Sequence, residues 1–284
     1  MKYLITGASG QLGYDIIREL EKRGEFAYLA PTSKQMNITD YFAVDEVVSN
    51  YKPDVIFHCA AYTAVDKAEE DKDNCYNVNV NGTKNIVDVA RKVGAKVVYI
   101  STDYVFDGTK DGIYNTLDLT NPINFYGYTK LLGEKEVEAL DNSLIVRISW
   151  VFGINGKNFV KTMLKLAETK KELSIVCDQV GSPTYTKDLS KLLVDMVKTD
   201  KKGVFFATNE GYCSWYEFAN YIFKINNIEM KTNPILTKDY KQVAKRPLNS
   251  KLSKDKLEEE GLERLPDWQD AVSRYCKVLK KEMK

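Results

Sequence analysis

MKYLITGASGQLG, residues 1–13, places a short apolar run directly before three glycines. The run covers residues 2–6, and Gly7, Gly10 and Gly13 follow at a spacing of three. This pattern predicts a strand, a glycine turn and a helix that begins at Gln11. A backbone that passes close to a diphosphate leaves no room for Cβ, and a helix N-terminus offers free N–H groups to the phosphates. The stretch therefore predicts nucleotide binding, with a purely structural turn as the alternative.

Composition and charge narrow the class of protein. The chain has 284 residues, with 41 Lys and Arg against 40 Asp and Glu, a formal net charge of +1. This balance gives no reason to expect nucleic acid or an anionic membrane as a partner. The first predicted strand begins at residue 2, which leaves no room for a secretory signal, and no apolar run reaches membrane-spanning length. We therefore expect a cytoplasmic protein.

Cysteine and histidine usage argues against metal and triad chemistry. No CxxC spacing occurs, so we expect reduced core thiols and no metal site. The only histidine, His58, sits inside an apolar run, where packing or hydrogen bonding is the better interpretation than a Ser-His-Asp triad. The five cysteines are Cys59, Cys75, Cys177, Cys213 and Cys276.

Apolar strands and amphipathic helices alternate through the first half of the chain. This alternation predicts an α/β fold with a doubly wound, Rossmann-like parallel sheet, whose ligands bind at the carboxyl ends of the strands. Strands are predicted at 2–6, 26–30, 55–59, 96–100 and 143–150, and helices from residue 11 and at 41–51, 67–93 and 125–140.

The pattern loosens after Trp150. We expect a dinucleotide-binding domain at 1–149 and a smaller C-terminal substrate lobe at 150–284, with part of 174–207 returning to the main sheet. The charged run 254–260 is expected to be a solvated helix face. Further helices are predicted at 157–169, 187–198, 215–226 and 268–279, and strands at 173–177 and 204–207.

Tyr126 and Lys130 lie four residues apart at the start of a predicted helix, so both side chains project from one face. A nearby ammonium lowers the pKa of a phenol, and we expect Lys130 to do this for Tyr126. Tyr128 has Leu132 four residues on and lacks such a partner. The pair alone is common in helices. Together with the glycine turn and the hydroxyls of the segment 101–104, it points to hydride transfer with a tyrosine proton donor.

Motifs along nearly the whole chain resemble the dTDP-4-dehydrorhamnose reductases, atypical members of the extended short-chain dehydrogenase/reductase superfamily. The tyrosine and lysine pair is shared across that superfamily, whereas STDYVFDG, RISWVFG and DQVGSPT are more specific to this branch. The motifs are TGASGQLG at 6–13, CAAYTAVDKAEED at 59–71, NVNGT at 79–83, STDYVFDG at 101–108, YGYTK at 126–130, RISWVFG at 147–153, DQVGSPT at 178–184 and RPLNSKL at 246–252.

The resemblance implies that NADPH or NADH reduces the 4-keto group of dTDP-4-dehydro-L-rhamnose to give dTDP-L-rhamnose. It implies that Tyr126 protonates the developing alkoxide, Thr102 hydrogen-bonds the same oxygen, and Lys130 tunes Tyr126 and holds the ribose. Asp103, Tyr104 and Trp150 are expected to shape the sugar pocket. The other implied cofactor contacts are Gly7, Gly10, Gln11, Leu12, Gly13, Asn37, Ile38, Ala60, Ala61, Tyr62 and Asn79.

The end of the second predicted strand leaves the choice between NADPH and NADH open. An acidic residue there would hold the ribose 2′-hydroxyl of NADH. This chain has none, and Thr32, Ser33 and Lys34 offer groups for a 2′-phosphate, although such a turn is commonly just solvated.

Three other activities stay open at this stage. A 4,6-dehydratase places a glutamate where Tyr104 follows Asp103 here, so its base is missing. A 4-epimerase shares the tyrosine and lysine pair, and only the branch motifs disfavour it. A non-catalytic, regulatory nucleotide-binding subunit would not need the catalytic residues. The sequence also leaves open whether the chain forms a homodimer, which 6-deoxyhexose it takes, and whether a divalent ion matters.

Overall fold

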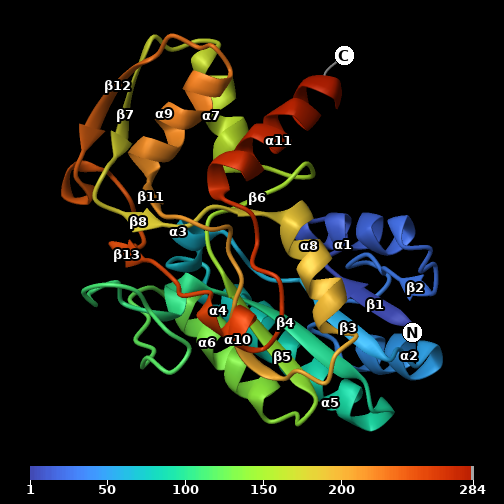
Figure 1. Cartoon of the computed structure of the whole chain (residues 1–284). Helices are drawn as coiled ribbons and strands as arrows, with labels where there is room; N and C mark the ends of the chain where they lie inside the picture. Colours follow the sequence, from blue (N-terminus) through green and yellow to red (C-terminus); the bar gives the residue numbers. More distant parts are fainter. Residues whose placement is uncertain (283–284) are drawn as a thin grey trace.

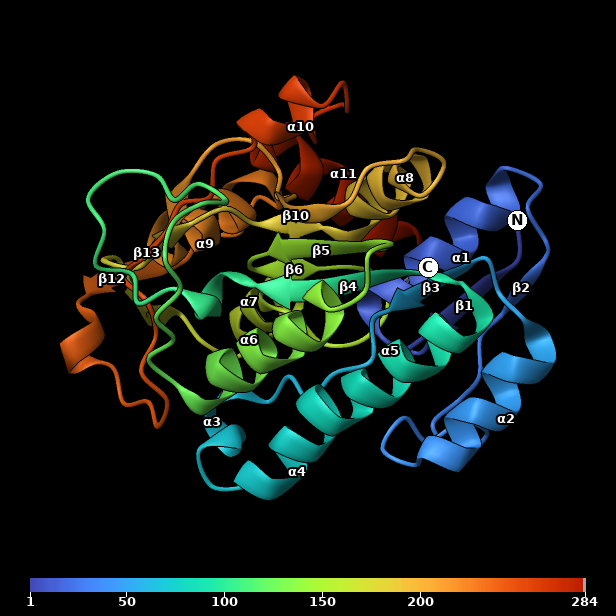
Figure 2. The ribbon, with the colours of Figure 1, turned by 90° about the horizontal axis from the view of Figure 1, so that it is seen from below.

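A six-stranded parallel sheet forms the centre of this computed structural model, which describes residues 1–282. The strand order is β10-β5-β4-β3-β1-β2, so the chain crosses from β1 toward both edges (Figure 2). This arrangement is the predicted doubly wound sheet. Its strands are β1 (Tyr3–Thr6), β2 (Tyr28–Leu29), β3 (Val55–His58), β4 (Lys96–Thr102), β5 (Ser143–Ile148) and β10 (Gly203–Phe206).

Helices cover both faces of the sheet, and each face has its own apolar core (Figure 2). On one face lie α1 (Gln11–Lys22) and α8 (Thr186–Met196), whose leucines pack on β1, β3 and β5. On the other lie α2 (Tyr41–Tyr51), α5 (Gly82–Val93) and α6 (Phe125–Glu138). Because both faces are buried, the central strands read as continuous apolar runs, which is why the sequence predicts them well.

The predicted helical region over 67–93 is helical over most of its length but is not one regular α-helix. The chain forms α3 (Val65–Ala68), α4 (Lys72–Tyr76), the π-helical turn η1 (Asn77–Asn81) and then α5. The buried amide of Asn79 in η1 hydrogen-bonds the backbone of Tyr62 on the loop after β3. Single π turns within helices occur frequently at functional sites.

The second lobe is built from helices and short strands above the carboxyl end of the sheet (Figure 1). Its core is rich in aromatic side chains. Three helices carry most of its core: α7 (Phe159–Ala167), α9 (Trp215–Ile225) and α11 (Trp268–Glu282). The strand pairs are β6 (Val151–Phe152) with β9 (Thr184–Tyr185), β7 (Glu172–Val176) with β12 (Lys231–Ile235), and β8 (Val180–Gly181) with both β11 (Cys213–Ser214) and β13 (Asn249–Ser250). The remaining elements are the 3-10 turns η2 (Asp103–Val105) and η3 (Thr237–Asp239) and the helix α10 (Asp255–Glu259).

The charged run 254–260 is not simply a solvated face. Lys254 is buried, with its ammonium 4.3 Å from the centre of the Tyr212 ring, and Leu257 of α10 joins the core beside the sheet. The periodicity of charge could not reveal this, because the partner ring comes from a loop forty residues earlier. The boundary between domains 1–149 and 150–284 stays a prediction, and β10 of the second half pairs with β5 in the main sheet.

Candidate active site

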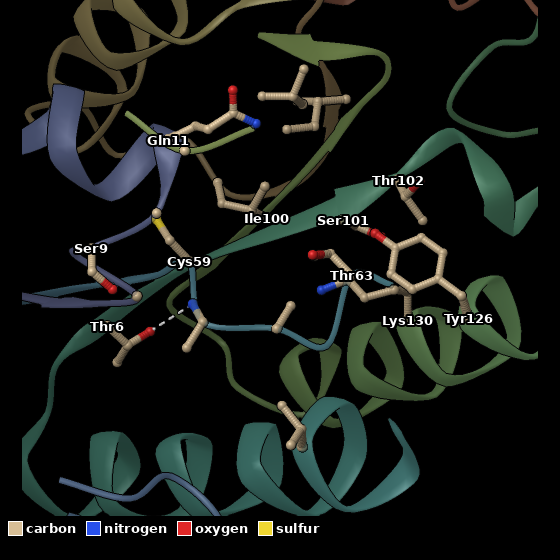
Figure 3. Close-up of a pocket in the computed structure, with 18 of the residues that line it drawn as sticks. Thr6, Ser9, Gln11, Cys59, Thr63, Ile100, Ser101, Thr102, Tyr126 and Lys130 are labelled. Atoms are coloured by element: carbon tan, nitrogen blue, oxygen red, sulfur yellow. Dashed lines mark hydrogen bonds between the residues drawn. The ribbon is translucent and has the colours of Figure 1, made fainter. Parts of the chain in front are cut away.

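A cavity of about 1040 Å³ opens at the carboxyl end of the parallel sheet, below the second lobe (Figure 3). The loops after β1, β2, β3, β4 and β5 all contribute to its wall, together with α6, α7 and α9. This is where ligands bind in open α/β sheets. Of the predicted site residues, the lining includes Gly7, Gly10, Gln11, Asn37, Ile38, Ala60, Ala61, Thr102, Asp103, Tyr104, Tyr126, Lys130 and Trp150.

The glycine turn packs closely against itself and against the loop after β3. Gly7 has φ +66°, and a Cβ there would lie 2.7 Å from the backbone nitrogen of Ala60. A Cβ on Gly13 would lie 2.5 Å from the Gly7 carbonyl oxygen, so this glycine serves packing within the turn. Helix α1 begins at Gln11 as predicted, and its N-cap, Gly10, makes no side-chain cap hydrogen bond. The first N–H groups of α1 are thus left for a ligand.

Gln11 and Leu12 differ in what they can contact. The Gln11 side-chain oxygen, Oε1, accepts hydrogen bonds from the Gly153 N–H and the Asn158 amide, at 2.8 and 3.0 Å, which ties the glycine turn to the second lobe. Leu12 is buried in the core beneath the sheet and, like Gly13, does not line the cavity. Leu12 can therefore reach a ligand only through its backbone.

The wall after β2 carries the two residues expected near an adenine. Asn37 and Ile38 both line the cavity, and the Asn37 amide oxygen accepts from the backbone and hydroxyl of Thr39. Thr32 and Ser33 also line it, whereas Lys34 is not among the lining residues. The Thr32 hydroxyl donates to the Gln35 side chain at 2.9 Å.

Asn79 and Tyr62 lie behind the wall rather than on it. The amide of Asn79 accepts from the Tyr62 N–H at 2.8 Å and donates to the Thr129 hydroxyl at 3.0 Å. Asn79 is buried, and the Tyr62 hydroxyl turns away to donate to Asp71. The contribution of Asn79 is therefore to hold the segment that carries Ala60 and Ala61.

Thr102, Tyr126 and Lys130 gather where β4 meets α6 (Figure 3). The Thr102 hydroxyl donates to the Asp103 carboxyl at 3.0 Å and accepts from the Tyr104 N–H at 3.2 Å. The Lys130 ammonium lies 3.9 Å from the centre of the Tyr99 ring. The helix approaches η2 closely because a glycine, Gly127, faces the Tyr104 carbonyl with no room for Cβ. The site thus joins a hydroxyl, a phenol and an ammonium in one corner.

Burial controls the protonation of this corner. Burial lowers the pKa of Lys130 to about 7 and raises the pKa of Asp103 to about 6. Burial, and after it the Asp103 carboxyl, raises the pKa of Tyr126 above its usual value, although the Thr102 hydroxyl acts in the opposite direction. The pKa of Tyr126 is therefore raised on balance and not lowered as expected, because burial is the largest influence on it. The phenol stays protonated, which is the form that a proton donor needs.

Aromatic side chains of the second lobe form the opposite wall. Trp150 has φ +48° and stacks on Trp215 with ring centres 3.7 Å apart and planes 12° apart. Phe159 lies 4.6 Å from the Trp215 ring, and Phe218 continues the cluster. Trp215, Phe159 and Phe218 line the cavity, and the sequence analysis did not single them out. No spacing signal joins them to Trp150, since they come together only through packing.

His58 and the cysteines add no catalytic group. The two nitrogens of His58 lie 2.8 Å from the Thr6 hydroxyl and 3.1 Å from the Thr83 hydroxyl, and burial lowers its pKa to about 3. The five cysteines are all free thiols. In the part of the chain that the structure covers, no three His, Cys, Asp or Glu side chains are grouped as metal ligands, and no helix is long and apolar enough to span a membrane.

Comparison with known proteins supports the family resemblance that the sequence motifs indicate. Residues 1–281 match the family model described as the RmlD substrate binding domain. A dTDP-4-dehydrorhamnose reductase of Aggregatibacter actinomycetemcomitans is 39% identical over 285 residues, covering 95% of this chain and 97% of the relative. A solved dTDP-4-dehydrorhamnose reductase from Clostridium acetobutylicum is 41% identical with a TM-score of 0.95, covering 99% of this chain and 100% of the other.

A second solved structure carries a cofactor. The dTDP-4-dehydrorhamnose reductase of Bacillus anthracis, in complex with NADP, is 39% identical with a TM-score of 0.95, covering 98% of this chain and 100% of the other. Fold, family model and relatives agree over nearly the full length. This chain therefore belongs to the RmlD substrate binding domain family, together with the dTDP-4-dehydrorhamnose reductases that its motifs resemble.

Proposed function

We propose that this protein reduces the 4-keto group of dTDP-4-dehydro-L-rhamnose to give dTDP-L-rhamnose, with NADPH or NADH as the reductant. The observation that carries the proposal is the meeting of Thr102, Tyr126 and Lys130 in one cavity, beside a glycine turn. Family membership and the reductase relatives support it. A nucleotide sugar is thus the substrate class.

The cavity fits the cofactor on structural grounds, because the glycine turn and the N-terminus of α1, whose N-cap Gly10 has no capping side chain, both border it. Gly7, Gly10 and the first N–H groups of α1 would hold the diphosphate. Asn37 and Ile38 would contact the adenine, Ala60 and Ala61 the middle of the molecule, and Lys130 the ribose next to the nicotinamide. When bound, the reduced nicotinamide supplies a hydride to a carbonyl carbon.

The remaining chemistry belongs to this chain. Tyr126, protonated at neutral pH, donates its proton to the oxygen that becomes the new hydroxyl. Thr102 would donate its hydroxyl proton to the same oxygen and orient it, and this hydrogen bond would replace the one that it donates to Asp103 in the ligand-free protein. The ammonium of Lys130 stabilises the phenolate that Tyr126 leaves behind.

The second lobe would bind the sugar nucleotide. Trp150 and Trp215 present a stacked apolar wall to the cavity, suited to a sugar face or a base. We accordingly assign dinucleotide binding to residues 1–149 and substrate binding mainly to 150–284. Thr32 and Ser33 line the cavity with hydroxyl groups, and no acidic residue lies beside them in its wall, so this part of the cavity would accept the 2′-phosphate of NADPH.

We also infer that the protein acts in the cytoplasm. Its five free thiols suit a reducing compartment. Cell fractionation with an antibody against the chain tests this directly, and recovery in a secreted fraction would contradict it.

The test of the reaction is to incubate the purified protein with dTDP-4-dehydro-L-rhamnose and NADPH and to follow both the nicotinamide absorbance and the sugar product. One reduced cofactor consumed per dTDP-L-rhamnose formed is the expected result. An isomeric keto sugar without cofactor consumption would indicate an epimerase. Tight NADPH binding without any turnover would indicate a regulatory subunit.

A further inference from the structure

Helix α6 carries a third buried polar side chain on the face that holds Tyr126 and Lys130. Glu134 lies one turn beyond Lys130 and is 0% exposed. Its carboxylate accepts hydrogen bonds from the Arg147 guanidinium, from Nε at 2.9 Å and from Nη2 at 2.6 Å. It also accepts from the Ser101 hydroxyl. A charge buried so completely is retained only with partners of this kind.

The partners of Glu134 connect the helix to the strand of the active-site hydroxyl. Ser101 on β4 and Arg147 on β5 are directly paired neighbours in the sheet, and Glu134 binds both. The next residue of β4 after Ser101 is Thr102. Moving α6 along β4 would break all three hydrogen bonds at once. The carboxylate thus fixes the helix that carries the phenol and the ammonium against the strand that carries the hydroxyl.

The guanidinium is itself held in place. Arg147 lies 5.2 Å from the ring centre of Phe106 and 5.8 Å from that of Phe206, and it is 4% exposed. Such a planar, bidentate and ring-flanked arrangement leaves the ion pair little freedom. The ion pair of Glu134 and Arg147 is therefore held rigidly behind the active site.

Glu134 is also an anion within the electrostatic reach of Lys130. Its carboxylate is the largest influence that opposes the effect of burial on the pKa of Lys130. Other titratable groups near Lys130 are Tyr126, Cys59 and Cys75, whose pKa values burial raises, His58, whose pKa burial lowers to about 3, and the ring of Tyr99. None of these carries a negative charge at neutral pH. Glu134 is therefore the neighbour that most favours the charged form of Lys130.

We propose that Glu134 is a positioning residue of the active site, which locks α6 to β4 and β5 through Ser101 and Arg147 and so fixes Tyr126 and Lys130 where the substrate ketone and the cofactor ribose would bind. This inference rests on the proposed function, but its first consequence is measurable without any reaction. A variant that removes the charge of Glu134 must alter the titration of Lys130. A variant that keeps the charge and only shortens the side chain must not.

The first experiment follows the titration of Lys130 by NMR in the ligand-free protein with isotope-labelled lysine. The Lys130 signal is assigned by its loss in Lys130→Met. Its midpoint is expected near pH 7 in the parent. In Glu134→Gln, which keeps the shape and loses the charge, the midpoint should fall by about one pH unit or more. In Glu138→Gln, an exposed carboxylate on the same helix, it should not move.

The second experiment measures kcat/KM against pH for the same variants. Glu134→Gln should lose at least tenfold in kcat/KM and shift its basic limb to lower pH, in parallel with the NMR midpoint. Glu134→Asp keeps the charge but shortens the side chain, so it should lose kcat with no shift of that limb; this variant also decides the case if Glu134→Gln does not fold. An unchanged Lys130 midpoint, with kcat/KM within twofold of the parent, would overturn the proposal. Should no variant or parent turn over the sugar, the proposed function fails, while the NMR result still decides the role of Glu134.

Discussion

The two walls of the cavity are built in different ways. The wall expected to face the cofactor is mostly backbone and small side chains, from Gly7, Gly10, Ala60 and Ala61. The wall expected to face the sugar is made of large side chains, with Trp150 and Trp215 stacked at 3.7 Å. A backbone wall tolerates no added atom, whereas a side-chain wall should lose function in steps. Between them stands the corner of Tyr126 and Lys130, where chemistry rather than shape should dominate.

The largest effect should come from that corner. Tyr126→Phe removes the proton donor and little else, so kcat should fall by about 10²–10⁴-fold while NADPH affinity stays within a few fold. Tyr128→Phe, at an exposed position two residues on, is the matched control and should keep full turnover. Steady-state kinetics and a direct binding titration provide both numbers. Undiminished turnover in Tyr126→Phe would leave the proton donor unassigned.

The next effect should come from the backbone wall. In Gly7→Ala the new Cβ meets the Ala60 nitrogen at 2.7 Å and the residue must keep φ +66°. We expect NADPH affinity to fall by tenfold or more and the free energy of unfolding to fall by about 2 kcal/mol, since the left-handed conformation alone costs about 1–2 kcal/mol. Gly24→Ala separates the two causes, because Gly24 has φ +73° but open space around its Cβ. If the free energy of unfolding fell equally in both variants, the backbone conformation alone, and not the contact with Ala60, would explain the loss of stability in Gly7→Ala.

The third effect concerns the buried carboxyl of Asp103, which lines the cavity and should lower the stability of the protein at neutral pH. The folded pKa of Asp103 is about 6, above its unfolded value of 3.8, so the folded state binds more protons between these values and stability falls as pH rises through that window. Asp103→Asn should flatten this dependence and gain about 1–2 kcal/mol at neutral pH.

Asp107 provides a control of opposite sign. Hydrogen bonds, the Thr109 N–H first, lower its pKa to about 2, so its contribution to stability is present above pH 3.8 and is lost as pH falls toward 2. Asp107→Asn should therefore be less stable at neutral pH. Denaturant unfolding of both variants across pH 3 to 8 makes the comparison, and a gain in Asp107→Asn would contradict it.

The smallest effect should come from the stacked ring. Trp215→Leu removes a stacking partner of Trp150, and such pairs contribute about 0.5–1.5 kcal/mol beyond their buried area. We expect KM for the nucleotide sugar to rise by about two- to tenfold, with NADPH affinity unchanged. Tyr216→Leu, the next residue of α9, does not line the cavity and should leave KM alone. A change in NADPH affinity in Trp215→Leu would remove the proposed division of labour between the walls.

Local patterns predicted much of the first half correctly. Helix α1 begins at Gln11 and α2 covers Tyr41–Tyr51, as their glycine, apolar and turn signals indicate. Thr102, Tyr126 and Lys130 do share one cavity, since strand ends and a following helix converge in any such sheet. Their roles stay predictions until the variants are measured.

Sequence patterns failed where a residue serves a distant partner. The π turn carries Asn79, whose side chain contacts Tyr62, seventeen residues earlier. Lys254 is buried against Tyr212, and Trp215 of α9 stacks on Trp150, which lies between β5 and β6. The two-residue strands of the second lobe are too short for any periodicity to appear.

By itself, therefore, the amino-acid sequence determined the parallel sheet, the glycine turn and the candidate catalytic residues, because each depends on spacing within a few residues of the chain. Only the tertiary structure decided which side chains close the cavity, that Glu134 and Arg147 lie behind it, and that burial raises the pKa of the Tyr126 phenol. These outcomes depend on desolvation and on contacts between residues far apart in sequence, which no local pattern encodes.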